Sequence, residues 1–133
     1  MQKIKIVAVG RIKEKFLRDA LAEYEKRLSR YCKLEIIEVE EGSSILPKLA
    51  GKIFPLCIEG EMFDSMDFSK LFQDETEVTF VIGGSEGLDN EVKQKGRGVS
   101  FSHMTFPHQL MRVILLEQVY RGFRIINGEP YHK

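Results

Sequence analysis

Short apolar runs and longer amphipathic stretches alternate along the chain. Short runs of apolar and β-branched residues bounded by turn residues indicate strands. They predict five strands, at residues 3–9, 34–39, 53–58, 78–82 and 99–101. Apolar residues that recur every three or four positions indicate one face of a helix. They predict helices at residues 12–30, 67–72, 89–95 and 107–125. Strands that alternate with helices favour an α/β sandwich with a mostly parallel sheet.

The first predicted helix and the segment after the second strand differ in kind. In residues 12–30 the apolar positions at helical spacing are Phe16, Ala20, Leu21, Tyr24 and Leu28. Basic side chains can occupy the remaining circumference of this helix. Residues 40–52 have turn composition instead, and they predict at most a short helix.

The last helix is the most apolar of the predicted helices. Pro107 suits its first position, because the fixed φ of proline is already helical. Its apolar stripe consists of Met111, Ile114, Leu115, Val119 and Phe123, and the stripe is broadened by Val113 and Leu116. A helix this apolar needs burial on more than one side, by the sheet alone or by the sheet and a second subunit. The polar residues that a plain core does not explain are His108, Arg112, Glu117, Gln118, Tyr120, Arg121 and Arg124.

One polar pair on this helix allows two interpretations. Glu117 and Arg121 stand four residues apart, which is the spacing of an ion pair on a helix surface. The same pair could hold an active-site arginine in place. The spacing alone leaves both interpretations open.

Length and composition indicate one globular domain. The chain has 133 residues, and no internal repeat or low-complexity linker divides it. No apolar run approaches the roughly 20 residues that span a bilayer, so we expect no membrane protein. The first residues lead straight into a strand pattern without a signal-peptide core, and the expected location is the cytoplasm. Cys32, Cys57 and three histidines match no metal-ligand spacing, so we expect free thiols and no metal site.

The net charge of zero conceals an uneven distribution of charge along the chain. Residues 1–33 carry ten Lys and Arg against four Asp and Glu, and residues 92–133 carry seven against two. Residues 34–91 carry three against fourteen. If the two ends meet in the fold, they can form one basic face for a nucleic acid. The alternative is that these charges only solvate helix surfaces.

Three chain breaks after predicted strands are candidate ligand positions. They fall at residues 58–60, at Gly83-Gly84 and at residues 102–105. Ligands of open parallel sheets bind beyond the carboxyl ends of the strands, where these breaks lie. The pattern Gly83-Gly84-x-x-Gly87 matches neither the dinucleotide fingerprint nor a P-loop, which disfavours an enzyme that uses a dinucleotide. Taken alone, it is an ordinary tight turn between a strand and a helix.

The end of the chain has an unusual composition. Residues 127–133 contain Pro130, which stiffens the backbone, followed by Tyr131 and His132. An aromatic ring and a titratable group therefore stand side by side. The alternative is a disordered end, which is common at chain termini.

Several long motifs, in this order, carry a resemblance to a known family. The motifs are residues 6–13 (IVAVGRIK), 22–28 (AEYEKRL), 81–88 (VIGGSEGL), 101–113 (FSHMTFPHQLMRV), 117–121 (EQVYR) and 129–133 (EPYHK). With these motifs the chain resembles the RlmH methyltransferases of the SPOUT class over nearly its whole length, except residues 40–52. The resemblance implies a C-terminal trefoil knot, an exception to the rule that chains do not thread loops.

The resemblance also implies a function. It implies a homodimer with each active site at the subunit interface, and S-adenosyl-L-methionine bound in the knot. The expected reaction is methylation of N3 of a pseudouridine in 23S rRNA on the assembled ribosome. The implied cofactor contacts are Leu56, Gly83, Gly84, Phe101, Ser102, His103, Met104, Thr105 and Phe106.

The expected catalytic residues are Glu117, Arg121, Tyr131 and His132. Methylation requires loss of the imide proton from N3 or stabilisation of the resulting anion. We expect His132 to act as the base and Tyr131 to stack or hydrogen-bond beside it. Arg121, held by Glu117, would stabilise charge on a pyrimidine carbonyl. His108 is expected to be structural or to lie on the cofactor side.

The chain departs from the family pattern in several places. Residues 40–52 are shorter than usual, and Cys57 stands where an acidic residue is common. Glu61 and His103 stand where lysine is frequent, and Asn127 where a basic residue is frequent. The last three changes weaken positive charge. They leave open an alternative, a catalytically weak RNA- or nucleotide-binding module on the same fold.

Overall fold

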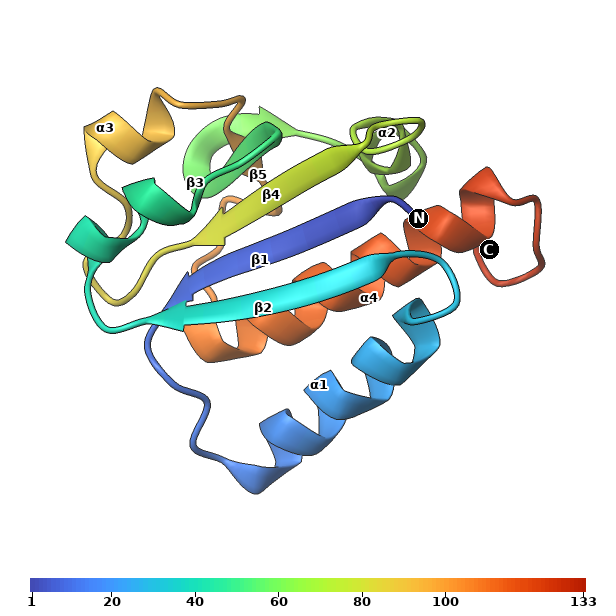
Figure 1. The fold of residues 1–133 in the computed structure, drawn as a ribbon, viewed down its shortest axis with the longest axis horizontal. Helices are drawn as coiled ribbons and strands as arrows, with labels where there is room; N and C mark the ends of the chain where they lie inside the picture. Colours follow the sequence, from blue (N-terminus) through green and yellow to red (C-terminus); the bar gives the residue numbers. More distant parts are fainter.

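A five-stranded parallel sheet forms the centre of the molecule (Figure 1). The computed structural model describes residues 1–133. The strands are β1 (Lys3–Val9), β2 (Lys33–Val39), β3 (Lys52–Met62), β4 (Glu77–Ile82) and β5 (Val99–Ser100). Their order is β2-β1-β4-β3-β5, and every pairing is parallel. The predicted α/β class with a parallel sheet is confirmed.

Helices cover the two faces of the sheet unequally. They are α1 (Lys15–Leu28), α2 (Ser65–Lys70), α3 (Asn90–Lys93) and α4 (His108–Ile126), with 3-10 turns η1 (Gly42–Ser44) and η2 (Leu46–Lys48). On one face α4 packs between α1 and α2, over a core of 20 buried residues. On the other face α3 and the segment with η1 and η2 cover only six buried residues. The short connection after β2 explains this thin layer, since crossovers between parallel strands usually contain a full helix.

Two helix starts differ from the sequence prediction. Helix α1 begins at Lys15, and its buried face carries Leu17, Leu21 and Leu28. Phe16 was predicted to lie on that face but is 69% exposed. Leu17 is one residue further along, which turns it by about 100° around the helix and onto the core. Pro107 is the residue before α4 and not its first turn, because its ψ of 132° is extended.

Helix α4 buries its apolar stripe only in part. Leu115, Leu116, Val119 and Phe123 are buried, whereas Met111, Val113 and Ile114 are half-buried. Val113 packs against the core, whereas Met111 and Ile114 line hollows at the surface of this chain. Burial of the helix on the side of the sheet is confirmed, and burial by a second subunit stays a prediction.

A buried arginine ties α4 to the ends of β1 and β2. Arg112 is 1% exposed. Its Nη1 donates to Oε2 of Glu38 at 2.5 Å, and its Nη2 donates to the carbonyls of Gly10 at 2.5 Å and Val9 at 3.4 Å. We call this group of four residues the Arg112 clamp. It explains one of the polar residues that the helix pattern left without a role.

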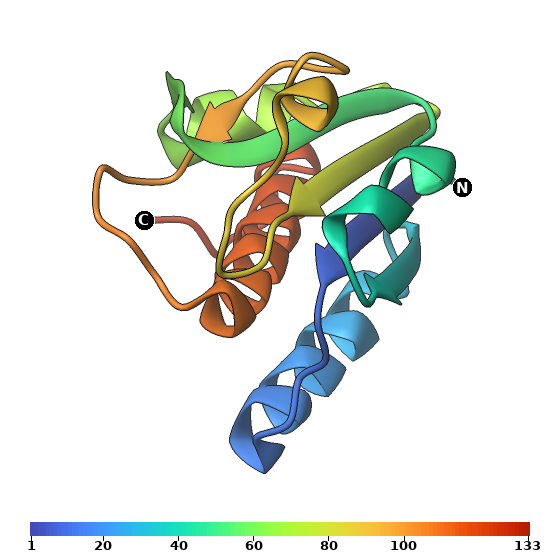
Figure 2. The same cartoon turned by 90° about the vertical axis from the view of Figure 1, so that its left-hand side faces the viewer.

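Strand β3 changes its pairing partner near the carboxyl edge of the sheet. It pairs with β4 only as far as Pro55 and then with β5, where its register shifts between Leu56 and Glu61. Proline has no N–H for a sheet hydrogen bond, which suits the point where the pairing changes. The chain then runs from β5 through residues 101–107 into α4, the segment in which the resemblance predicts the trefoil knot (Figure 2).

Candidate functional site

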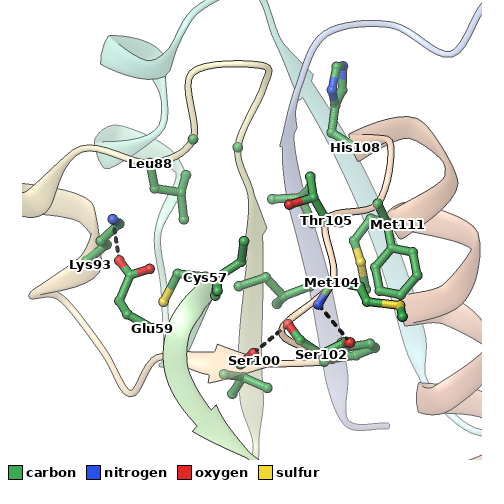
Figure 3. Close-up of a pocket in the computed structure, with 18 of the residues that line it drawn as sticks. Cys57, Glu59, Leu88, Lys93, Ser100, Ser102, Met104, Thr105, His108 and Met111 are labelled. Atoms are coloured by element: carbon green, nitrogen blue, oxygen red, sulfur yellow. Dashed lines mark hydrogen bonds and ion pairs between the residues drawn. The ribbon is translucent and has the colours of Figure 1, made fainter.

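A cavity of about 260 Å³ lies where β3 separates from β4 (Figure 3). Its walls come from the ends of β3 and β4, from α3, from β5 and the loop after it, and from the start of α4. The lining residues are Leu56, Cys57, Ile58, Glu59, Ile82, Gly83, Gly84, Gly87, Leu88, Lys93, Val99, Ser100, Phe101, Ser102, Met104, Thr105, Phe106, His108 and Met111. This is the carboxyl edge of a parallel sheet, the usual ligand position in such folds.

Most of the residues expected to contact a cofactor line this cavity. They are Leu56, Gly83, Gly84, Phe101, Ser102, Met104, Thr105 and Phe106. His103 is exposed and does not line it. His108 also lines the cavity.

The turn after β4 presents bare backbone to the cavity. Gly87 N–H donates to the carbonyl of Gly84 at 3.0 Å, and Gly87 has a φ of +74° that favours glycine. A Cβ on Gly83 would lie 2.7 Å from the carbonyl carbon of Gly87. The tight turn therefore excludes a side chain at Gly83 and leaves its peptide groups at the wall of the cavity.

The loop after β5 is held by its own hydrogen bonds. The hydroxyl of Ser100 donates to the carbonyl of Ser102 at 3.1 Å, and the N–H of Met104 donates to Ser102 Oγ at 3.0 Å. Ser100 is buried, while Met104 is 73% exposed. The loop thus has a fixed base and an exposed tip.

Glu59 and Lys93 are the charged pair of the cavity. Glu59 Oε1 and Lys93 Nζ form an ion pair between the end of β3 and α3. The hydrogen bond from Lys93 is the main reason why the pKa of Glu59 is lowered and that of Lys93 is raised. Burial, and then the charge of Glu59, raises the pKa of the nearby Cys57 thiol. The motifs did not identify this group, although the break after the third strand falls at Glu59.

These walls fit an adenosine cofactor. Apolar side chains such as Leu56, Leu88 and Phe101 offer flat contact for a purine, and bare peptide groups of the glycine turn offer hydrogen bonds. Glu59 and Ser102 add polar groups to the same walls. This mixture of apolar walls and few polar groups is typical of small-molecule sites.

The four residues expected to act in catalysis lie together on α4 and the chain end. Arg121 donates through Nε and Nη2 to the two carboxylate oxygens of Glu117, at 3.2 and 3.1 Å. Tyr131 donates its hydroxyl proton to Glu117 Oε2 at 2.8 Å. Arg121 Nη1 lies 3.2 Å from Nδ1 of His132, and its guanidinium carbon lies 4.8 Å from the centre of the Tyr131 ring. We call these four residues the C-terminal cluster.

The charge states in the C-terminal cluster follow from these contacts. The hydrogen bond to Glu117 raises the pKa of Arg121, so the guanidinium stays protonated. Burial, followed by the hydrogen bond to Glu117, raises the pKa of Tyr131 to about 12. Tyr131 is therefore a neutral donor at physiological pH.

The chain end is docked and not frayed. Tyr31 donates to Glu129 Oε1 at 2.7 Å. Arg124 donates to Glu129 Oε2 at 3.2 Å and to the carbonyl of Pro130 at 3.0 Å. These contacts join the tail to α4 and to the residues after α1, so the alternative of a disordered end is wrong.

Within one chain the C-terminal cluster does not line the cavity. His132 lines a neighbouring hollow of about 480 Å³, together with Phe63, Met66 and Gln118. The two hollows share Val99, Ser100, Phe101 and Phe106, so the segment from β5 to the start of α4 separates them. Most of the residues expected to contact a cofactor therefore line one hollow, whereas His132, which is expected to act in catalysis, lines the other.

The two basic ends of the chain meet in the fold. Helix α1 packs against α4, and Gln109 Nε2 donates to the carbonyl of Arg11 at 3.2 Å. The condition for one basic face is therefore met.

No group of three or more His, Cys, Asp and Glu side chains is placed to hold a metal ion. None of the helices has both the length and the apolar character to cross a bilayer.

Fold and cavity define a parallel α/β protein with a ligand site at the carboxyl edge of its sheet, and comparisons with known proteins identify its family. The family described as "Predicted SPOUT methyltransferase" matches residues 2–132. Two proteins named ribosomal RNA large subunit methyltransferase H are similar over 98% of this chain and 99% of their own length. The one from Clostridium botulinum is 48% identical, and the one from Clostridium tetani is 46% identical. The chain therefore belongs to the SPOUT methyltransferases and, among them, to the RlmH family.

Two further findings concern length and fold. The alignments with these relatives run over 157 positions, whereas this chain has 133 residues, so at least 24 positions have no counterpart here. A shortened chain was expected from residues 40–52. A solved structure described as a probable methylase family protein from Haemophilus influenzae matches with a TM-score of 0.67 at 10% identity. The match covers 98% of this chain and 70% of the chain of that structure. At this low identity it supports the fold alone.

Proposed function

We propose that this protein transfers the methyl group of S-adenosyl-L-methionine to N3 of a pseudouridine in 23S rRNA, on the assembled ribosome in the cytoplasm. The observation that carries the proposal is the convergence of eight expected cofactor residues on one cavity at the carboxyl ends of β3, β4 and β5. The relatives' names indicate rRNA of the large subunit as the class of substrate.

The C-terminal cluster supplies the chemistry that the acceptor needs. When bound, the cofactor supplies a methyl group already activated by its sulfonium, so the protein must mainly align donor and acceptor. The N3 position of the pyrimidine carries a proton, and its electron pair must be free to take the methyl group. The protein therefore needs a proton acceptor and a group that stabilises charge on the neighbouring carbonyls.

An exchange of partners at Arg121 satisfies both needs. A guanidinium only donates, so Nδ1 of His132 accepts from Arg121 as the cluster stands. When the guanidinium turns to a carbonyl oxygen of the pyrimidine, Nδ1 becomes free to take the N3 proton. Glu117 keeps Arg121 in reach through its second contact, and the Tyr131 ring stacks beside it. The proton would thus move from N3 to His132. The electron pair of N3 would form the new bond to the methyl carbon while the carbon–sulfur bond of the donor breaks and S-adenosylhomocysteine leaves.

A homodimer would bring the two halves of the site together. Within one chain no residue of the cluster lines the cavity, so neither half of the site is complete by itself. The apolar side chains that one chain leaves uncovered include Met62, Met66, Leu110 and the half-buried Met111 and Ile114. A second copy on this surface would bury them and place the tail of one subunit against the cavity of the other.

The basic face formed by α1 and the C-terminal third is the proposed contact with rRNA. One small domain has few groups for reading bases, so shape and phosphate contacts should dominate. Glu61, one of the replaced basic positions, pairs with Arg97 at 2.7 Å and does not line the cavity. The assembled ribosome would supply the rest of the specificity.

Removal of the tail tests the proposal. A variant that ends at Pro130 lacks Tyr131 and His132 but keeps every residue of the cavity. We expect calorimetry to show unchanged binding of S-adenosyl-L-methionine and methyl transfer to ribosomes to be lost. Full transfer by the shortened protein would refute the assigned roles. Cofactor binding without transfer in the intact protein would favour the alternative, a binding module on the same fold.

A further inference from the structure

We propose that Glu59, held by Lys93, positions the cofactor by accepting hydrogen bonds from the two ribose hydroxyls. This inference rests on the proposed function, because it requires an adenosine ligand in the cavity. It assigns a role to the charged pair, which the family motifs do not include.

The backbone around Glu59 is fixed on its C-terminal side. A Cβ on Gly60 would lie 2.7 Å from Val99 N, so this glycine allows β3 to approach the chain just before β5. The next residue, Glu61, donates its N–H to the carbonyl of Gly98 at 3.0 Å. Glu59 therefore projects from a backbone that cannot shift freely.

The side chain of Glu59 is oriented mainly by Lys93. Lys93 contacts Oε1, and the second carboxylate oxygen points toward the cavity in Figure 3. The side chain of Lys93 is 30% exposed and that of Glu59 is 60% exposed, so Lys93 is the better packed of the two. Lys93 also keeps the carboxyl ionised, and an ionised carboxylate only accepts hydrogen bonds.

The charge of the pair selects hydroxyl groups over a cationic group. Glu59 is the only carboxylate among the lining residues. Its charge is already balanced by Lys93, whose ammonium would repel the amino group or the sulfonium of the cofactor. Neutral hydroxyls face no such repulsion and can donate to a carboxylate, as in dinucleotide sites where an acidic residue holds a ribose.

Ligands that lack one hydroxyl test this contact directly. The probes are S-adenosylhomocysteine and its 2′-deoxy and 3′-deoxy analogues, and the readout is the dissociation constant by calorimetry. Glu59→Ala should weaken S-adenosylhomocysteine about tenfold to a hundredfold, the loss expected for hydrogen bonds to a charged group. The same substitution should weaken each deoxy analogue less than S-adenosylhomocysteine, because one of the two hydrogen bonds to Glu59 is already absent in each analogue.

Glu61→Ala is the matched control, since Glu61 lies two residues further along β3 and outside the cavity. It should bind all three ligands like the unchanged protein. Lys93→Met should weaken S-adenosylhomocysteine less than Glu59→Ala and keep the preference for both hydroxyls. Equal losses for all ligands in Glu59→Ala, or no loss, would overturn the inference. Failure of the unchanged protein to bind S-adenosylhomocysteine would instead overturn the proposed function itself.

Discussion

Removal of the charge from Glu38 should destabilise the protein through the Arg112 clamp. Arg112 is held by one carboxylate and two carbonyls, and its Nε has no partner in the structure. Glu38→Gln keeps the size of the side chain and an oxygen that can still accept from the N–H of Ile12, now at 3.2 Å. It removes only the countercharge of a buried guanidinium.

The expected magnitude follows from the exposure of the two partners. Breaking a buried ion pair by removing one partner costs about 3–5 kcal/mol. The side chain of Arg112 is 2% exposed, but that of Glu38 is 40% exposed, so water screens part of the interaction. We therefore expect a loss of about 2 kcal/mol. For a chain of this size, that lowers the Tm by roughly 8 °C.

Thermal unfolding followed by circular dichroism at neutral pH measures this effect. Glu35→Gln is the matched control, because Glu35 lies on the same strand, is exposed and loses the same charge. It should unfold within about 2 °C of the unchanged protein. The argument for the Arg112 clamp is refuted if Glu38→Gln is as stable as this control.

Three further predictions follow from burial and charge. The folded pKa of Tyr131 is raised from 10.0 to about 12, so the docked tail should keep its stability below pH 10 and lose it as the pH rises toward 12. Tyrosinate absorbance, compared with Tyr131→Phe, measures this loss. Iodoacetamide should label Cys57 but not Cys32, because Cys32 is buried and burial raises its pKa to about 12. Since Cys57 lines the cavity, S-adenosylhomocysteine should protect it from labelling, as measured by mass spectrometry. Leu17→Ala should cost about 2–3 kcal/mol in denaturant unfolding and Phe16→Ala less than about 0.5 kcal/mol, and the reverse order would contradict the position of α1.

The local pattern of apolar and polar residues was sufficient to predict most of the strands and helices. Strands buried on both faces, such as β4, appear as continuous apolar runs, and a long periodic stretch such as α4 leaves little choice of structure. The cavity could also be placed, because chain breaks after parallel strands meet at one edge of the sheet. The motif of residues 101–106 then indicated which loop closes it.

Contacts between distant parts of the chain could not be predicted in this way. Arg112 and Glu38 are 74 residues apart, and Tyr31 and Glu129 are 98 apart, so no local spacing reveals either pair. The choice between Phe16 and Leu17 depends on a rotation of α1 by one residue, which the neighbours in space decide. The Glu59–Lys93 pair depends on the path of β3 after Pro55, where it leaves its partner strand.

Methyl transfer to intact ribosomes tests the central claim most directly. Ribosomes from a strain without the modification would be incubated with the protein and S-adenosyl-L-methionine, and the 23S rRNA would be digested to nucleosides for mass spectrometry. We predict one new N3-methylpseudouridine per large subunit, with little product on isolated 23S rRNA. Absence of a methylated pseudouridine with a protein that binds the cofactor would contradict the account.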